Sequence, residues 1–290
     1  MSNVIIFGAG LYGHKYALDC LQKGDNILYF VDNDSAKHGT ACTLEPAGGG
    51  AEMSFNILHP NALLKTEFDK VVVATHTGFN EVVAQLLEQG IAPHKIDRSY
   101  TEHNVWARKV FLQNFATLAK ERNLEGNCAE VGVYRGDFAR HINASFPEKI
   151  LYLMDTFEGF AAIDLQNENK GAQNIGAGHF ANTSVELVLS KMPHVQRCVV
   201  RKGWFPDTAR GLEDERFCFV SLDTDLHDPI LAGLEFFYPR LVNGGVILVD
   251  DYFSTGYVGV KQAVDCFAAK MRISVAPIGD NGGVILIKRG

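Results

Sequence analysis

The sequence predicts an α/β protein built from two doubly wound, Rossmann-like domains, and two observations support this. An apolar strand runs into a glycine-rich turn and then a helix twice, over residues 4–23 and again over residues 128–144. Each opening is followed by a second apolar strand that ends in an acid, Asp32 in the first case and Asp155 in the second. Strands that alternate with helices form parallel, doubly wound sheets. A unit found twice therefore indicates two domains.

Length and composition agree with this class. The chain has 290 residues, of which 47% are hydrophobic and 21% charged, as expected for a folded globular protein. Its formal net charge of −7 argues against sequence-independent binding to nucleic acid or anionic membranes. The N-terminus lacks the basic region of a secretory signal, and no apolar run is long enough to span a membrane. Six cysteines without a Cys-x-x-Cys pair fit free thiols, so we expect a cytoplasmic protein.

The first domain is predicted over residues 1–100. Its glycine-rich turn has the spacing of the dinucleotide fingerprint, and a further buried strand covers residues 70–75. These features predict a nucleotide site whose residues are Gly8, Gly10, Gly13, Asp32 and Thr75.

The second domain is predicted over residues 101–290 and begins with an amphipathic helix at about 104–122. The last two strands, 272–277 and 283–288, are separated by a turn too short for a crossover helix. They should pair antiparallel and place a reversed strand at the end of the sheet. This layout resembles that of class I methyltransferases.

The glycine-rich turn of the second domain, residues 130–136, is the first candidate site. Glycines let the backbone approach a ligand closely, and the following helix N-terminus suits a carboxylate or phosphate. Asp155 could accept the hydroxyl protons of a ribose, so a nucleoside-like ligand is expected. The alternative is a tight turn without a ligand.

An acidic cluster is the second candidate site. The predicted strands before residues 223 and 250 are apolar up to their acids, so Asp223, Asp250 and Asp251 should meet at the carboxyl edge of the sheet. Carboxylates brought together repel, and a hard divalent cation would offset that repulsion. Helix capping explains Asp228 before Pro229, but it does not explain the other three acids.

Five segments in register carry a more specific resemblance. They are residues 130–136 (EVGVYRG), 155–160 (DTFEGF), 203–208 (GWFPDT), 222–226 (LDTDL) and 244–252 (GGVILVDDY). Over about residues 105–270 the chain resembles the macrocin O-methyltransferase (TylF/MycF-type) family. The resemblance implies a metal-dependent, S-adenosylmethionine-using O-methyltransferase that acts on a sugar hydroxyl.

The resemblance also implies roles for individual residues. The methionine end of the cofactor would lie at Glu130, Gly132 and Gly136, its ribose at Asp155, and its adenine near Gly203 and Trp204. The cofactor-binding residues implied in full are Glu130, Gly132, Val133, Tyr134, Gly136, Asp155, Thr156, Phe157, Gly203, Trp204 and Asp223. Asp223, Asp250 and Asp251 match the ligands of a divalent cation, which we expect to be Mg²⁺.

The proposed chemistry needs a base, because the pKa of a sugar hydroxyl lies far above neutrality. His227 is our candidate base, with Asp225 and Asp223 as the other catalytic residues. Two alternatives stay open: Asp225 could instead orient the substrate, and His179 could act as the base.

The first domain resembles the small Rossmann-like N-terminal domains of PglD-type sugar acetyltransferases, on the basis of residues 32–34, 37–39 and 72–75. In that family the domain helps to bind a nucleotide-linked sugar. Here it could hold the nucleotide of the acceptor, bind NAD, or serve only for packing and dimerisation.

Taken together, we predict a methyltransferase that modifies a sugar, and we expect a nucleotide-linked sugar used in polysaccharide or natural-product biosynthesis. The expected partners are a small-molecule sugar or nucleotide sugar and further copies of the chain in a homo-oligomer. An amine acceptor stays open. Two rival functions are an NAD-dependent nucleotide-sugar oxidoreductase and a non-catalytic nucleotide-sugar binding or scaffold protein. The intact acids Asp223, Asp250 and Asp251 argue against the second rival.

Overall fold

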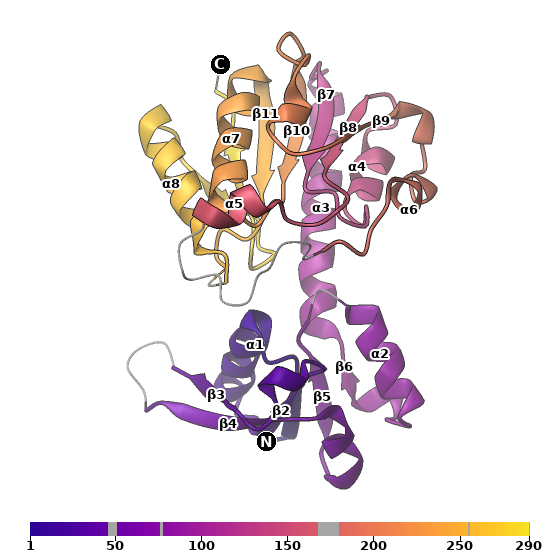
Figure 1. Ribbon diagram of the computed structural model, residues 1–290, viewed down its shortest axis with the longest axis vertical. Helices are drawn as coiled ribbons and strands as arrows, with labels where there is room; N and C mark the ends of the chain where they lie inside the picture. The colour runs from indigo at the N-terminus through magenta and orange to yellow at the C-terminus, as the bar shows by residue number, and fades with distance from the viewer. Residues whose placement is uncertain (46–50, 76–77, 168–179, 255, 290) are drawn as a thin grey trace. The chain divides into compact units, whose positions relative to one another are not determined.

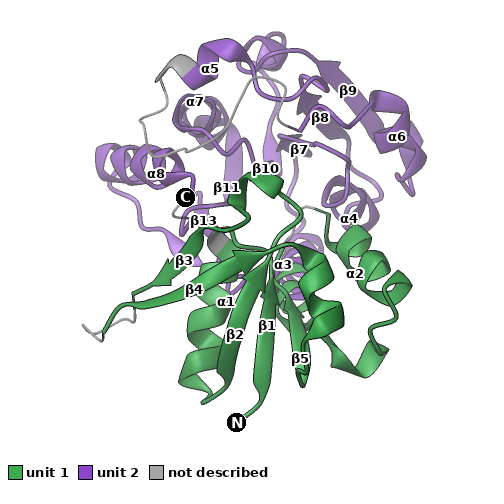
Figure 2. Cartoon of the chain, turned by 60° about the horizontal axis from the view of Figure 1, so that its bottom comes forward, with its two compact units in different colours: residues 1–105 green, residues 106–290 purple. Residues whose placement is uncertain are grey.

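We describe the protein from a computed structural model, which describes residues 1–45, 51–75, 78–167, 180–254 and 256–289. The chain divides into two compact units, residues 1–105 and residues 106–290 (Figure 2). Helix α3 (Ser99–Glu121) begins earlier than the helix predicted at about residue 104. Its first turns belong to unit 1 and the remainder belongs to unit 2.

Unit 1 contains a six-stranded sheet with the order β3-β4-β2-β1-β5-β6 (Figure 1). Its strands are β1 (Asn3–Phe7), β2 (Asn26–Val31), β3 (Ala41–Leu44), β4 (Met53–Leu58), β5 (Lys70–Val73) and β6 (Ile96–Asp97). All neighbouring pairs are parallel except β3 with β4, which is antiparallel. The predicted parallel core is confirmed, and the β3–β4 pair extends it at one edge.

Two helices cover the sheet of unit 1. Helix α1 (Leu11–Gln22) buries Tyr16 and Cys20 against one face, and α2 (Phe79–Glu88) buries Val82 and Leu86 in the apolar cluster of the other. Because both faces are covered, the central strands β1 and β5 carry continuous apolar runs instead of alternating ones.

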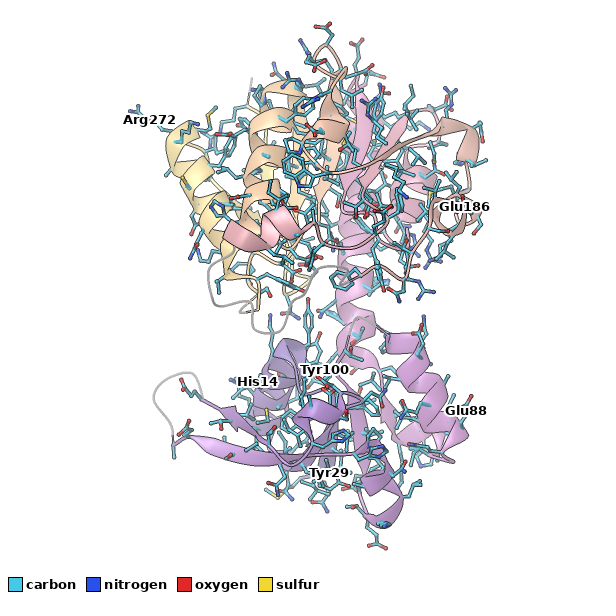
Figure 3. The ribbon with its side chains drawn as sticks, in the orientation of Figure 1. His14, Tyr29, Glu88, Tyr100, Glu186 and Arg272 are labelled. Carbon is cyan, nitrogen blue, oxygen red and sulfur yellow. The ribbon has the colours of Figure 1, made fainter. Side chains whose placement is uncertain are left out.

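Unit 2 contains a seven-stranded sheet with the order β12-β13-β11-β10-β7-β8-β9. Its strands are β7 (Asn127–Val131), β8 (Leu151–Asp155), β9 (Cys198–Lys202), β10 (Phe217–Leu222), β11 (Leu241–Val249), β12 (Ala276–Pro277) and β13 (Val284–Ile287). Its other helices are α4 (Ala139–Ser145), α5 (Ala162–Asn167), α6 (Val185–Ser190), α7 (His227–Phe237) and α8 (Val258–Met271). Helix α8 ends at Arg272, which has a left-handed backbone and is labelled in Figure 3.

The antiparallel pairing of the last two strands is confirmed, but the predicted place of the reversed strand is wrong. Strand β13 pairs antiparallel with both β11 and β12, so it lies inside the sheet. The edge strand β12 runs parallel to the rest. The short turn between β12 and β13 makes these two strands pair. Strand β13 also pairs with β11 over more residues than it does with β12, so it lies between the two.

The core of unit 2 forms two layers. Helices α7 and α8 pack on one face of the sheet, and α3, α4 and α6 contribute to the apolar cluster of the other. Leu112, Phe115 and Ala119 are the buried apolar positions of α3 in this layer, and their spacing places them on one side of the helix. In the described part of the chain, no helix combines the length and apolarity needed to cross a bilayer.

Candidate functional site

The glycine-rich turn of unit 2 lies against the acid that follows β10. Gly132 has a left-handed backbone (φ 84°), and a Cβ atom there would lie 1.8 Å from the carbonyl oxygen of Asp223. Only glycine permits this approach. Because β7 and β10 are parallel neighbours, the turn and the acid meet at the carboxyl edge of the sheet.

Asp155, predicted to bind a ribose, holds this turn in place. Its Oδ2 accepts hydrogen bonds from the backbone amides of Val133 (2.7 Å) and Tyr134 (2.8 Å), and its Oδ1 accepts one from Phe157 (2.7 Å). A carboxylate offers about four lone-pair positions. These contacts therefore leave limited acceptor capacity for a ligand hydroxyl.

The neighbouring residues predicted to bind the cofactor differ in whether their side chains are buried in the core or lie at the edge of the sheet. Val133 and Phe157 are buried in the core, so only their backbones are available at the edge. Tyr134 donates its hydroxyl proton to Asn182 Oδ1 (2.7 Å), and Thr156 donates to the carbonyl oxygen of Gly159 (2.7 Å).

The segment after β9 adjoins the same edge. The Gly203 amide donates to the carbonyl oxygen of Asp155 (2.9 Å). The indole Nε1 of Trp204 lies 3.0 Å from both carboxylate oxygens of Asp164 in α5. A Cβ atom on Gly136, the last glycine of the turn after β7, would lie 3.0 Å from Val188 Cγ1.

Glu130, at the end of β7, is a buried acid. Only 1% of the residue is exposed, and Oε2 has no hydrogen-bond partner among the described residues. Burial raises the pKa of Glu130 well above its ordinary value, Asp223 raises it further, and Arg108 opposes this. A buried acceptor of this kind suits a cationic donor. This fits the ammonium group of a methionine moiety.

Three acids converge beside the glycine-rich turn. One carboxylate oxygen from each of Asp223, Asp225 and Asp251 lies within 4.8 Å of the others. Asp225 and Asp251 both have left-handed backbones (φ 62° and 54°), a conformation uncommon outside glycine. A hard cation binds carboxylate oxygens at roughly 2.0–2.6 Å, so oxygens this close can share one ion. The donor set fits a divalent cation.

Asp250 is placed differently from the other predicted metal ligands. Its carboxylate forms an ion pair with the guanidinium of Arg108 in α3, which also lies 3.5 Å from Asp223 Oδ2. The structure therefore brings Asp223 and Asp251 together with Asp225, while Asp250 faces an arginine.

The convergence disfavours full ionisation of these acids. Burial raises the pKa of Asp223 and Asp225 well above the usual range, and neighbouring carboxylates add to the effect. Burial, followed by the charge of Asp250, raises the pKa of Asp251 to about 7. Positive charge placed among these groups would stabilise their ionised forms.

The candidate base His227 is the first residue of α7. Its Nδ1 lies 2.7 Å from Asp228 Oδ1, so the carboxylate can orient the imidazole. Asp225 belongs to the acidic cluster. The other candidate, His179, lies outside the described residues.

The predicted site of unit 1 is explained mainly by packing. A Cβ atom on Gly8 would lie 2.8 Å from the carbonyl oxygen of Ala74, and one on Gly13 would lie 1.9 Å from that of Gly8. Gly10 is different, because a Cβ atom there would meet nothing within 4 Å. The carbonyl oxygen of Thr75, the remaining predicted residue, accepts a hydrogen bond from α3.

Asp32, the acid of the predicted nucleotide site, is engaged by the glycine-rich turn after β1 and by its own loop. It accepts hydrogen bonds from the amides of Ala9 (2.8 Å) and Asp34 (2.9 Å) and an ion pair from Lys37 (2.9 Å). Burial raises the pKa of Asp32, but these hydrogen bonds and the lysine charge outweigh burial and lower it overall.

Two residues near the acidic edge are absent from the sequence-based site. Asp164 lies in a short helix with no motif around it. Arg108 stands one turn before Leu112 on the buried side of α3, and a lone arginine at such a position is the signal that could have marked it.

The strand order of unit 2, with its reversed strand beside β11, defines a class I methyltransferase fold. Solved structures of other methyltransferases share it, NovP and CalS11 among them. The O-methyltransferase NovP has a TM-score of 0.53 and 22% identity, over 63% of this chain and 80% of that one. The calicheamicin methyltransferase CalS11 has a TM-score of 0.50 and 18% identity, over 72% of this chain and 85% of that one.

The chain belongs to the macrocin-O-methyltransferase (TylF) family, which it matches over residues 104–284. Residues 1–97 match the C2185-like N-terminal family, and the resemblance of this region to PglD-type domains stays a hypothesis.

Curated relatives match part of the chain, and two of them align over about half of it. Mycinamicin III 3''-O-methyltransferase from Micromonospora griseorubida is 30% identical over 49% of this chain and 61% of its own length. Demethyldecarbamoylnovobiocin O-methyltransferase from Streptomyces niveus is 26% identical over 52% of this chain and 62% of its own length. The chain thus spans about three fifths of these relatives.

Proposed function

We propose that the protein is an S-adenosylmethionine-dependent O-methyltransferase that acts on a sugar hydroxyl with the help of a divalent cation. The observation that carries this proposal is the contact between the glycine-rich turn and the acidic cluster, where Gly132 lies directly against Asp223. A donor bound at the turn would lie beside an acceptor bound at the acids. The names of the relatives support a sugar acceptor, since one from Streptomyces olivaceus carries a rhamnosyl group in the name of its substrate.

S-adenosylmethionine would supply a methyl group on a sulfonium, which is a good leaving group. Glu130 would hold its ammonium group, and the backbone after β7, fixed by Asp155, would line its path. Trp204, held by Asp164, would offer its ring to the adenine. The main task of these residues is to align the reacting atoms.

The cation would be held by Asp223 and Asp251, with a third oxygen from Asp225, or from Asp250 once Arg108 releases it. It would supply positive charge beside the reacting hydroxyl. His227 would take the hydroxyl proton, and Asp228 would keep the imidazole in the tautomer that accepts at Nε2.

The test is a methyl-transfer assay with purified protein, S-adenosylmethionine and a panel of free and nucleotide-linked sugars, with the product detected by mass spectrometry. We expect S-adenosylhomocysteine binding, a sugar product 14 Da heavier per methyl group added, loss of turnover with EDTA and recovery with Mg²⁺. Full turnover in EDTA would contradict the cation role. Absence of S-adenosylhomocysteine binding would contradict the whole proposal.

For unit 1 we propose binding of the nucleotide part of the acceptor. The open space around Gly10 supports this proposal. The engagement of Asp32 by Lys37 argues against the NAD-dependent oxidoreductase, because the fingerprint acid must accept ribose hydroxyls. Titration of the chain with nucleoside diphosphates and with NADH separates these functions. A cytoplasmic location, a homo-oligomer and a place in polysaccharide or natural-product biosynthesis stay predictions.

A further inference from the structure

Arg108 lies within the acidic edge that the proposed function assigns to a cation. It projects from α3 to Asp250 and to Asp223, two of the three acids that the family resemblance implies as metal ligands. Its side chain is only 13% exposed, and the guanidinium lies 4.4 Å from the centroid of the Phe138 ring. The carboxyl groups of Asp280 and Glu130 also interact electrostatically with it.

A guanidinium keeps its charge at any pH a protein experiences. Arg108 is therefore a permanent cation among groups that also attract a divalent ion. It contacts Asp223, which belongs to the set of three acids that could share an ion, and it occupies Asp250, which would add a fourth carboxylate to that set. A second cation entering this region meets both its repulsion and a reduced number of free carboxylates.

We propose that Arg108 is an internal competitor of the divalent ion for Asp223 and Asp250, an inference that rests on the function proposed above. Without the ion, the arginine holds two of the acids together. When the ion binds, the guanidinium gives up at least its contact with Asp223. Arg108 is thus a positioning residue that sets how tightly the site holds its metal.

A purely structural role predicts something different. If the ion pairs only anchored α3 to the sheet, loss of Arg108 would loosen the acidic edge, and metal binding would weaken or stay unchanged. Competition predicts that the same loss tightens metal binding. The sign of the change in affinity therefore separates the two roles.

The experiment is a titration with Mn²⁺ alone, with free Mn²⁺ measured by electron paramagnetic resonance. We expect Arg108→Met to bind Mn²⁺ at least about tenfold more tightly than the unaltered chain. Arg122→Met is the matched control, because this exposed residue just beyond α3 loses the same charge. Its affinity should stay within about twofold, since exposed charges are well screened.

Two further variants keep the test sharp. Arg108→Met with Asp250→Asn should lose most of the gain, because the freed carboxylate is gone. Arg108→Lys keeps the charge but lacks the planar guanidinium, whose fixed donors reach both carboxylates, so it should bind Mn²⁺ about threefold more tightly. Arg108→Lys replaces Arg108→Met in the titration if the methionine variant does not fold.

Equal or weaker Mn²⁺ binding by a folded Arg108 variant would overturn the competition. S-adenosylhomocysteine binding, measured on the same preparations, reports separately on the proposed function. If the unaltered chain binds S-adenosylhomocysteine while the Arg108 variants show no gain in Mn²⁺ affinity, only the role of Arg108 fails.

Discussion

The carboxyl edges of the two sheets are built from the same parts but differ in how their acids are satisfied. In unit 1, Asp32 accepts hydrogen bonds from the backbone amides of Ala9 and Asp34 and pairs with Lys37, so its charge is balanced by groups of unit 1. In unit 2, Asp155 likewise holds its glycine-rich turn through backbone amides. Beyond Asp155, however, unit 2 gathers further carboxylates at the same edge.

The difference shows that packing and loop contacts alone can account for most residues of a strand–turn–helix motif. Gly8 and Gly13 are required by close packing within unit 1, and Asp32 is required by the loop. In unit 2, three acids beyond Asp155 converge at this edge. Buried Glu130 has an acceptor without a partner among the described residues, and Arg108 is a basic side chain that pairs with two acids of this edge.

The largest expected effect separates the two glycine-rich turns. Gly132→Ala should lower the free energy of unfolding of unit 2 by about 3–5 kcal/mol, because the new Cβ meets a carbonyl oxygen and the backbone is left-handed. Gly10→Ala should cost less than about 1 kcal/mol. Both tryptophans, Trp106 and Trp204, lie in unit 2, so their fluorescence in urea reports on Gly132→Ala. Far-UV circular dichroism reports on Gly10→Ala. Equal losses would remove the distinction.

The next prediction compares one acid from each edge. Asp223→Asn should lower kcat for methyl transfer by about a hundredfold or more. The variant loses a negative charge that would hold the cation beside the reacting hydroxyl. Asp32→Asn should change kcat by less than about threefold, since its carboxylate serves the loop. Initial rates at saturating S-adenosylmethionine measure both. A comparable loss of kcat in Asp32→Asn would place unit 1 in the chemistry.

A smaller effect is expected at Asp155. Asp155→Ala should lower the free energy of unfolding of unit 2 by about 2 kcal/mol, because three backbone amides lose a charged hydrogen-bond acceptor. It should also weaken S-adenosylhomocysteine binding, which calorimetry measures. Thr156→Ala is a nearby control that loses one hydrogen bond to a carbonyl oxygen. Similar losses in both variants would count against the anchoring role of Asp155.

The smallest effect concerns pH. Burial raises the pKa of Asp164, the charge of Asp228 adds to this, and the hydrogen bond from Trp204 opposes it. The folded state therefore keeps a proton that the unfolded state releases, so this contribution to stability falls as pH rises from about 4 through the folded pKa. The change should be below about 1 kcal/mol, since the group is only half-buried.

Asp164→Asn should flatten that part of the curve of unfolding free energy against pH. Asp214→Asn, at an exposed position, should leave the curve unchanged. Urea titrations followed by Trp204 fluorescence at several pH values provide the measurement. A steeper fall with pH in Asp164→Asn would reverse the assigned sign.

Much of the fold could be predicted from local pattern. Both glycine-rich openings, the acids that follow the next strands and the closing antiparallel pair follow from short-range spacing. The β3–β4 pair could not be predicted, because its strands are short and only partly buried and depend on pairing with each other. The place of β13 inside the sheet depends on long-range register with β11.

The residues of the candidate site that directly follow strands could be predicted from the sequence. Asp223 and Asp251 end adjacent strands, so their proximity follows from topology. Arg108 comes from a helix more than a hundred residues away in the sequence, and only tertiary packing brings its charge to Asp250. The ion-pair partner of an acid cannot be predicted from local sequence when that partner belongs to a distant element.

The contact between residue 132 and the carbonyl of Asp223 has a consequence for redesign. The space of one methyl group at position 132 is filled by the main chain of the other segment, so no side chain can be added at position 132 and the backbone of neither segment can shift alone. A chimaera that exchanges donor loops among relatives must carry the β10 tip along with the β7 turn. Libraries that randomise position 132 should return mostly unfolded clones.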